Sequence, residues 1–154
     1  LKLEINKTIM TIYEVCFGLF LSSFLSATIL PGQSEIALMS LIMIDKYSLN
    51  LLIFFSCIGN ILGSILNWFM GFKLEKFKNK KWFPATDLQL KKASHYYNKY
   101  GKCTLLLCWV PFIGDPITII AGLLRVPIFH FILIVSFAKI IRYLFVAYIS
   151  LSLI

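Results

Sequence analysis

The segment LNLLIFFSCIGNILGSILNWFMGF, residues 49–72, decides the class of fold. Its 24 residues are predominantly apolar. As an α-helix they would be about 36 Å long, enough to cross a hydrocarbon core of roughly 30 Å. The segment therefore predicts a transmembrane helix. Residues 127–154 predict a second one, because 28 residues would form a helix of about 42 Å.

The composition of the whole chain agrees with a membrane location. Of its 154 residues, 59% are hydrophobic and 14% are charged, and the mean hydropathy is +0.84. A soluble domain has roughly 25% charged residues. There are too few polar side chains here to cover a globule in water. Residues 1–154 are therefore expected to form a single all-α integral membrane domain, which excludes a soluble enzyme and a disordered chain.

Two further apolar stretches, residues 10–44 and 103–124, are each broken near the middle by proline and glycine. Each arm of the second stretch is eight residues long, or about 12 Å as a helix, which is under half of the bilayer core. Short arms that meet at proline and glycine predict two re-entrant hairpins. Their tips are expected to contain Pro31, Gly32, Pro111, Gly114 and Pro116.

The order of these segments predicts an internal repeat. A hairpin and a spanning helix are followed by a polar loop, and then by a second hairpin and a second spanning helix. One full crossing in each half inverts the second half relative to the first. The alternative is a four-helix bundle that spans at residues 12–30, 49–72, 103–124 and 127–154. It would place two prolines and an aspartate in mid-span.

The net charge of +8 is concentrated in residues 73–102, where nine lysines face only Glu75 and Asp87. A basic loop between two apolar segments is expected to be cytoplasmic by the positive-inside rule, which is favoured over a nucleic-acid surface. Within it, residues 86–100 have tyrosines on one helical face and lysines on the other. They predict an amphipathic helix in the membrane interface, or alternatively a cytoplasmic helix packed on the bundle.

Five charged residues are predicted to lie at membrane depth. Glu35 and Asp115 are at the hairpin tips, Arg125 closes the second hairpin, and Lys139 and Arg142 are in the middle of the last helix. A charge at mid-helix costs roughly 2.5 to 3.5 kcal/mol on insertion scales. Each of these groups therefore requires a partner or a function.

The first spanning helix adds a stripe of small and polar residues at helical spacing, which we expect to avoid lipid: Ser56, Asn60, Gly63, Ser64, Asn67 and Gly71. Together with the charges, the stripe predicts a polar cavity near the middle of the membrane. Three basic groups around two acids leave one positive charge, which suits a phosphate headgroup. The predicted substrate-binding residues are Arg125, Lys139, Arg142, Asn60 and Asn67.

Glu35 and Asp115 are expected to respond to protons, because burial of a carboxylate favours its neutral form. The alternative is structural. In it, internal salt bridges such as Glu35 with Lys139 and Asp115 with Arg142 hold the bundle together without any substrate.

Three motifs carry a resemblance to a known family: LSATILPGQSE (25–35), GNILG (59–63) and WVPFIGDPITIIAGLLR (109–125). They resemble the DedA family, also called the VTT or SNARE-associated family, and in particular its YqaA-like branch. The resemblance implies a multi-pass protein of the bacterial inner (plasma) membrane with two re-entrant hairpins. It also implies translocation of undecaprenyl phosphate or a phospholipid, with dependence on the proton-motive force.

The sequence departs from the wider family at the hairpins. Gln33 follows Pro-Gly where glutamate is usual, and Cys108 and Gly114 stand where arginines are usual. Either the charged site is rebuilt from other residues, namely Asp115, Arg125, Lys139 and Arg142, or the activity differs.

Three functions are therefore carried forward. The first is a lipid or lipid-carrier phosphate translocase, with proton coupling as an option. The others are a structural or assembly protein of the envelope membrane, and a small-ion or solute transporter. No nucleophile, metal or nucleotide motif indicates an enzyme, a metal site or a cofactor. The expected partners are membrane lipids and not nucleic acid, with homo-oligomer formation left open.

Overall fold

The computed structural model describes residues 2–28, 32–74, 95, 101–110 and 114–153, without the side chains of residues 2–11 and 101–103. Within these ranges all regular elements are helices. They are α1 (Lys2–Thr28), α2 (Gln33–Met43), α3 (Leu49–Leu74), η2 (Gly101–Trp109), α5 (Gly114–Leu123) and α6 (Ile128–Ser152). The predicted amphipathic helix over 86–100 lies outside the described residues apart from His95, as do the predicted tip residues Pro31 and Pro111.

The two long helices agree with the sequence prediction. α3 has 26 residues and α6 has 25, and both are apolar and long enough to cross a membrane. Their ends lie within two residues of the predicted boundaries. The prediction of an all-α fold is therefore confirmed for the described residues, and two helices are long and apolar enough to span a membrane.

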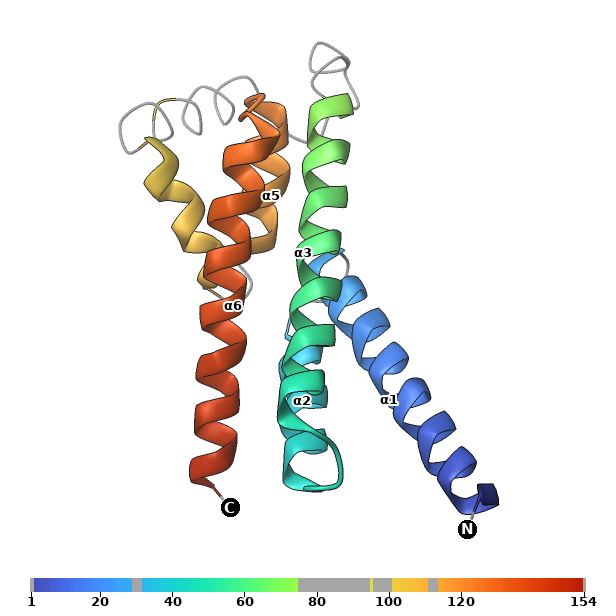
Figure 1. Ribbon diagram of the computed structural model, residues 1–154. Coiled ribbons are helices and arrows are strands. Elements are labelled where there is room, and N and C mark those ends of the chain that lie inside the picture. Colours follow the sequence, from blue (N-terminus) through green and yellow to red (C-terminus); the bar gives the residue numbers. More distant parts are fainter. Residues whose placement is uncertain (1, 29–31, 75–94, 96–100, 111–113, 154) are drawn as a thin grey trace.

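The other four helices described form two hairpins that approach from opposite ends of the molecule (Figure 1). α1 and α2 meet beside the middle of α3, and η2 and α5 meet beside the middle of α6. The N-terminal end of α1 and the C-terminal end of α6 lie at one end of the molecule. The end of α3 that leads into the lysine-rich segment lies at the other. The tips of both hairpins are thereby brought to mid-height.

Two predicted arms differ in detail from the structure. α1 begins at Lys2 rather than near residue 10, because apolarity marks the part of a helix that suits lipid and not the point where the helix starts. The first arm of the second hairpin is a 3-10 helix of nine residues. Its rise of about 2.0 Å per residue gives it a length of about 18 Å, compared with the 12 Å expected for an α-helical arm.

Glycines let the helices of the first hairpin approach α3 closely. A Cβ added at Gly59 would strike the carbonyl oxygen of Phe20, and one added at Gly63 would lie 2.7 Å from the Cβ of Ala27. Both glycines lie on the face of α3 that packs against α1, in the small-x-x-x-small spacing that brings membrane helices together. Only glycine therefore fits at this contact.

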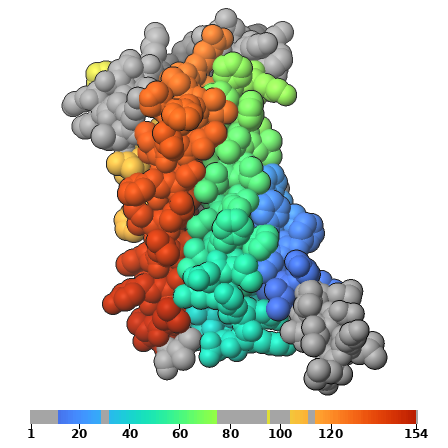
Figure 2. Space-filling model, in the orientation of Figure 1, coloured from blue at the N-terminus to red at the C-terminus, as the bar shows by residue number. Residues whose placement is uncertain are grey.

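The second hairpin uses the same device farther along α3. A Cβ at Gly71 would strike the carbonyl oxygen of Ile119, and a Cβ at Gly122 would strike that of Trp68. α3 and α5 are therefore in backbone contact. One helix, α3, thus positions both hairpins, and α6 completes the bundle beside it (Figure 2).

Two apolar clusters lie along the bundle, one above and one below its middle. The loop-side cluster, nearer the lysine-rich segment, consists of Trp68, Leu105, Cys108, Ala121, Val126, Phe131, Val135 and Ala138. The terminal-side cluster consists of Leu19, Leu38, Ile42, Leu52, Cys57, Tyr143 and Ala147. On α6 the first cluster ends at Ala138 and the second begins at Tyr143. The two buried residues of α6 between them, Lys139 and Arg142, are charged.

Candidate functional site

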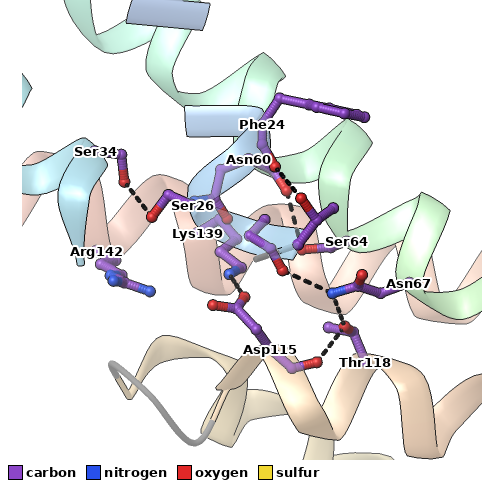
Figure 3. A network of polar contacts seen from close by, with 12 residues as sticks. Phe24, Ser26, Ser34, Asn60, Ser64, Asn67, Asp115, Thr118, Lys139 and Arg142 are labelled. Carbon is purple, nitrogen blue, oxygen red and sulfur yellow. Dashed lines mark hydrogen bonds and ion pairs between the residues drawn. The ribbon is translucent and has the colours of Figure 1, made fainter. Parts of the chain in front are cut away.

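Polar and charged side chains from five helices, most of them buried, form a layer between the two apolar clusters. Figure 3 shows part of this network, with the Lys139–Asp115 ion pair and the hydrogen bonds of Asn67. Lys139 is fully buried and Arg142 is only 4% exposed. We call this region the polar layer. It consists of Ser26, Ser34, Glu35, Asn60, Ser64, Asn67, Asp115, Thr118, Lys139, Arg142 and Tyr143.

The tip of the second hairpin contributes an ion pair to this layer. Lys139 Nζ of α6 lies 2.7 Å from Asp115 Oδ1. Asp115 is in the first turn of α5, where the free N–H groups and the helix dipole favour a carboxylate. Pro116 follows it, and proline is tolerated in a first turn because its missing N–H would have no helical partner.

The tip of the first hairpin contributes a second ion pair. Arg142 Nη2 of α6 pairs with Glu35 Oε1, and Glu35 lies in the first turn of α2. The Ser34 hydroxyl lies 3.1 Å from Glu35 Oε2 and also 3.1 Å from the Ser26 hydroxyl of α1. Each acid thus lies at the start of the returning helix of its hairpin, and each takes its cation from α6.

The pairing is the reverse of the one considered in the structural alternative, which joined Glu35 to Lys139 and Asp115 to Arg142. The reason is the direction of α6. It runs from the loop end to the terminal end, so Lys139 is one turn nearer the second hairpin and Arg142 one turn nearer the first. The pairing in the alternative was therefore wrong, although the four residues do meet.

Tyr143 connects the first ion pair to α3. Its hydroxyl donates to Ser34 Oγ at 2.9 Å and accepts from Asn60 Nδ2 at 2.9 Å. In the sequence Tyr143 directly follows Arg142, and it was not among the predicted site residues. Residue type could not have found it, because Tyr148 of the same helix is 72% exposed. The available signal was its position four residues after Lys139, on the same helical face.

Asn67 connects α3 to both hairpins through hydrogen bonds. Its Nδ2 donates to the Ala27 carbonyl at 2.7 Å and to Thr118 Oγ1 at 3.1 Å. Ala27 is in the last turn of α1, where carbonyls have no helical partner. Asn67 therefore caps the C-terminal end of α1 in the first hairpin and also contacts α5 in the second. Thr118, three residues after Asp115, was not singled out from the sequence.

The polar stripe on α3 is buried as predicted, since all six of its residues lie inside the bundle. Two of them, Asn60 and Asn67, are in hydrogen bonds with the hairpins and α6. The structure therefore brings both predicted amide residues to residues that neighbour the ion pairs, Asn60 to Tyr143 and Asn67 to Thr118.

Arg125 is not part of the polar layer. It is exposed at the turn between α5 and α6, with its guanidinium carbon 5.7 Å from the centre of the Phe72 ring. From Ile128 to Lys139 alone, α6 advances about 16 Å. The expectation that three basic groups surround the two acids is thus not met. The two ion pairs contain two acids and two cations, and their formal charges balance.

The turn that holds Arg125 has the backbone of a Schellman motif. The Val126 N–H bonds to the Ala121 carbonyl and the Arg125 N–H to the Gly122 carbonyl, and Arg125 has a positive φ of 54°. Glycine is the usual residue at this position. Arginine has a steric cost in this conformation that glycine does not have.

Of the other predicted tip residues, the two glycines lie where no other residue fits well. Gly32 precedes α2 with φ of 94°, a conformation that glycine adopts without a steric penalty. A Cβ at Gly114 would collide with the backbone of Cys108, where η2 and α5 meet. These two glycines place Glu35 and Asp115 at the tips.

Comparison with known proteins shows which family this chain resembles. The VTT domain model matches residues 30–152. The chain is 35% identical over 131 residues to inner membrane protein YqaA of Escherichia coli (strain K12), covering 85% of this chain and 87% of that protein. It is 33% identical over 144 residues to an uncharacterized protein of Haemophilus influenzae, covering 89% and 87%. No solved structure matches the chain.

The alignments with these relatives extend over most of the chain. Together with two apolar helices long enough to span a membrane, they place the protein in the bacterial inner membrane, as predicted. The chain belongs to the DedA family of VTT-domain membrane proteins, in its YqaA-like branch.

Proposed function

We propose that this protein translocates a lipid or lipid-carrier phosphate, such as undecaprenyl phosphate or a phospholipid, by binding its headgroup in the polar layer. The observation that carries the proposal is the position of Lys139 and Arg142. Two buried cations on one spanning helix are each held by an acid on a separate hairpin tip. A phosphate oxygen could replace either carboxylate, because both are oxyanions that accept charge-assisted hydrogen bonds.

The proposal includes a topology in which both hairpins are re-entrant and the halves form an inverted repeat. Its support is the entry of the two hairpins from opposite ends and the meeting of their tips at mid-height (Figure 1). Residues 73–102 would be cytoplasmic, with residues 86–100 at the interface, and both ends of the chain would be on the opposite side. Broken helices in matching halves are typical of transporter substrate sites.

Charge balance gives the proposal a requirement for protons. Two acids and two cations already compensate each other, so an added anion would leave an uncompensated charge in a low-dielectric layer. Uptake of a proton by Glu35 or Asp115 would restore the balance and release a cation for the phosphate. Headgroup binding and proton uptake would then occur together.

The conformation also bears on access. Apolar clusters lie on both sides of the polar layer, and we interpret this arrangement as an occluded state. Translocation requires the two clusters to open one at a time. We assign the protein no covalent chemistry.

A transport assay tests the proposal. Purified protein is reconstituted in vesicles with a fluorescent lipid phosphate, and the rate at which the lipid changes leaflet is measured. Arg142→Gln should slow this rate at least about tenfold, since a hydrogen bond to a charged group contributes about 1.5 to 3 kcal/mol. Lys46→Gln, which removes an exposed cation outside the layer, should leave the rate unchanged. Equal rates in all three proteins would contradict the proposal.

The structural alternative is favoured by one observation, the complete burial of Lys139. If the ion pairs only hold the bundle, the double variant Glu35→Gln with Arg142→Gln should keep the fold and the growth phenotype of the parent. If the protein is a translocase, this double variant should still fold but should no longer transport the lipid. A small-ion or solute transporter would instead move its ion or solute and leave the lipid rate at background.

A further inference from the structure

The two acids of the polar layer differ in what contacts their carboxyl groups. Each pairs with a cation through one oxygen, Glu35 through Oε1 and Asp115 through Oδ1. The other oxygen of Glu35, Oε2, lies 3.1 Å from the Ser34 hydroxyl. The hydroxyl of Thr118 donates instead to the backbone carbonyl of Asp115. Among the described residues, Glu35 is therefore the one acid of the layer whose carboxyl group has a hydrogen bond with a hydroxyl.

The Ser34 hydroxyl lies between three other oxygen atoms. Tyr143 donates to it at 2.9 Å, and Asn60 donates to the Tyr143 oxygen, which leaves the proton of that phenol for Ser34. Two acceptors, Glu35 Oε2 and Ser26 Oγ, lie at equal distances of 3.1 Å from Ser34 Oγ, and Figure 3 shows the contact with Ser26. A hydroxyl has one proton and two acceptor lone pairs. Ser34 can therefore donate to Glu35 or to Ser26, but not to both at once.

The charge of Glu35 determines which acceptor Ser34 uses. A hydrogen bond to an ionised group is roughly twice as strong as a neutral one, so Ser34 donates to Oε2 while Glu35 is a carboxylate. If Oε2 holds a proton, the acid can donate to Ser34 Oγ, and the Ser34 proton turns to Ser26. Ser34 then accepts two hydrogen bonds and donates one, which is its full capacity. The same arrangement of oxygen atoms thus suits both the charged and the neutral form of Glu35.

The titratable groups around Glu35 are consistent with this arrangement. α2 packs against α1, α3 and α6. In the described chain, the buried titratable groups of these three helices are Cys16, Cys57, Lys139, Arg142 and Tyr143. Lys139 is held by Asp115. Arg142 is therefore the cation that a proton on Glu35 would release.

We propose that Ser34 is a positioning residue that enables Glu35, rather than Asp115, to take up a proton at Oε2. The proton comes from water and forms an O–H bond on Oε2, while the O–H bond of Ser34 stays intact and rotates from Glu35 to Ser26. The inference rests on the proposed function in one respect, because it assigns to Glu35 the proton uptake that accompanies binding of the lipid phosphate. Since Ser26 is on α1 and Ser34 on α2, the protonation of Glu35 also changes a hydrogen bond between the two arms of the first hairpin.

Infrared difference spectroscopy tests which acid takes up the proton. The full chain, in a maltoside detergent without any lipid phosphate, is acidified stepwise, and the C=O stretching bands of protonated carboxylic acids are recorded. We expect one band that Glu35→Gln removes. The double variant Asp115→Asn with Lys139→Met should retain it. The proposal is overturned if no band depends on Glu35 at any pH at which the protein stays folded.

Variants of the serine hydroxyls test the role of Ser34. Ser34→Ala should move the Glu35 band to higher wavenumber, because a carboxylic acid that donates a hydrogen bond has a weaker C=O bond. Ser26→Ala should move it in the same direction by a smaller amount, since the Ser34 proton then has no acceptor other than Glu35. Simple packing by Ser34 would not produce this second shift, because the hydrogen bond of Ser26 is to Ser34 and not to Glu35.

Ser64→Ala is the matched control for these variants. Its hydroxyl is as buried as that of Ser34 but is bonded to the Asn60 carbonyl, so its removal should leave the Glu35 band in place. A band that stays at the parent position in Ser34→Ala or in Ser26→Ala would overturn the proposal. An equal shift in Ser64→Ala would overturn it as well.

Addition of undecaprenyl phosphate separates this inference from the proposed function. At a pH at which Glu35 of the lipid-free protein is mostly charged, the lipid should increase the Glu35 band, because its phosphate would take Arg142 from the carboxylate. A Glu35 band that depends on Ser34 but does not change with the lipid would support the proton site. The same result would contradict binding of this lipid phosphate beside Glu35.

Discussion

The two hairpins are alike in backbone and different in chemistry. Each places an acid in the first turn of its returning helix, and each packs against α3 through glycines. An inverted repeat of complete halves would supply one cation from each spanning helix. Here both cations come from α6, and α3 supplies the amides of Asn60 and Asn67 instead. The second spanning helix therefore serves both hairpins, and the polar layer forms only when the halves are assembled.

The ion pairs of the two hairpins differ as well. Lys139 presents a single ammonium that is fully buried against Asp115. Arg142 presents a planar group with five donors. Its Nη2 pairs with Glu35, and its Nε has no hydrogen-bond partner among the described residues. This difference predicts that the second pair holds the structure and that the first pair exchanges its partner.

Loss of the second ion pair, Asp115 with Lys139, should lower stability the most. Asp115→Asn leaves Lys139 as a buried charge without its acid, and we expect a loss of about 3 to 5 kcal/mol in stability. The stability is measured by thermal or denaturant unfolding in detergent. The double variant Asp115→Asn with Lys139→Met should recover most of the lost stability. A smaller loss for Asp115→Asn than for Glu35→Gln would contradict the distinction between the two pairs.

Adding a methyl group at the close contacts between helices should lower stability by an intermediate amount. Gly59→Ala and Gly71→Ala add a Cβ where the backbone of the first or the second hairpin already lies, and each should cost about 1 to 3 kcal/mol by overpacking. Gly18→Ala is the matched control, because a Cβ there meets no atom within 4 Å. It should be neutral or slightly stabilising, as helix propensity favours alanine by about 1 kcal/mol. If Gly18→Ala were as costly as the other two, close packing would not be the cause.

The smallest effect is expected at the turn that leads from the second hairpin into α6. Arg125→Gly should stabilise the protein by up to about 1 kcal/mol, because glycine adopts positive φ without steric cost. Unfolding in detergent measures this gain. Destabilisation would show that the arginine side chain, which contacts Phe72, contributes more to the fold than its backbone conformation costs.

Much of the fold could be predicted because it depends on apolar length. The two long helices, the broken stretches and the buried stripe of α3 follow directly from how far a helix can reach in a membrane. The length of α1 could not be predicted in this way, since residues 2–11 continue the helix beyond the apolar stretch. Nor could the 3-10 form of η2, because no residue pattern distinguishes its arm from a short α-helix.

The sequence predicted which charged residues form the candidate site, but not which acid pairs with which cation. The sequence pointed to Glu35, Asp115, Lys139 and Arg142 because charges within apolar segments are costly. Which acid meets which cation depends on the direction of α6 past two hairpin tips, a tertiary property. For the same reason Arg125 was expected near the acids, and the hydroxyls of Ser34 and Tyr143 were overlooked.

Thiol accessibility tests most directly whether the polar layer is a translocation site. Cys57 is in the terminal-side cluster and Cys108 in the loop-side cluster, and both are buried. The chain has four cysteines, so variants are made in which either Cys57 or Cys108 is the one cysteine kept and the other three are replaced by alanine. They are placed in vesicles and treated with a membrane-impermeant thiol reagent from each side. Without lipid phosphate, neither should react. With undecaprenyl phosphate, Cys57 should react from the side of the chain ends and Cys108 from the side of the basic loop. Both thiols remaining unreactive from either side with the lipid present would contradict translocation through this layer.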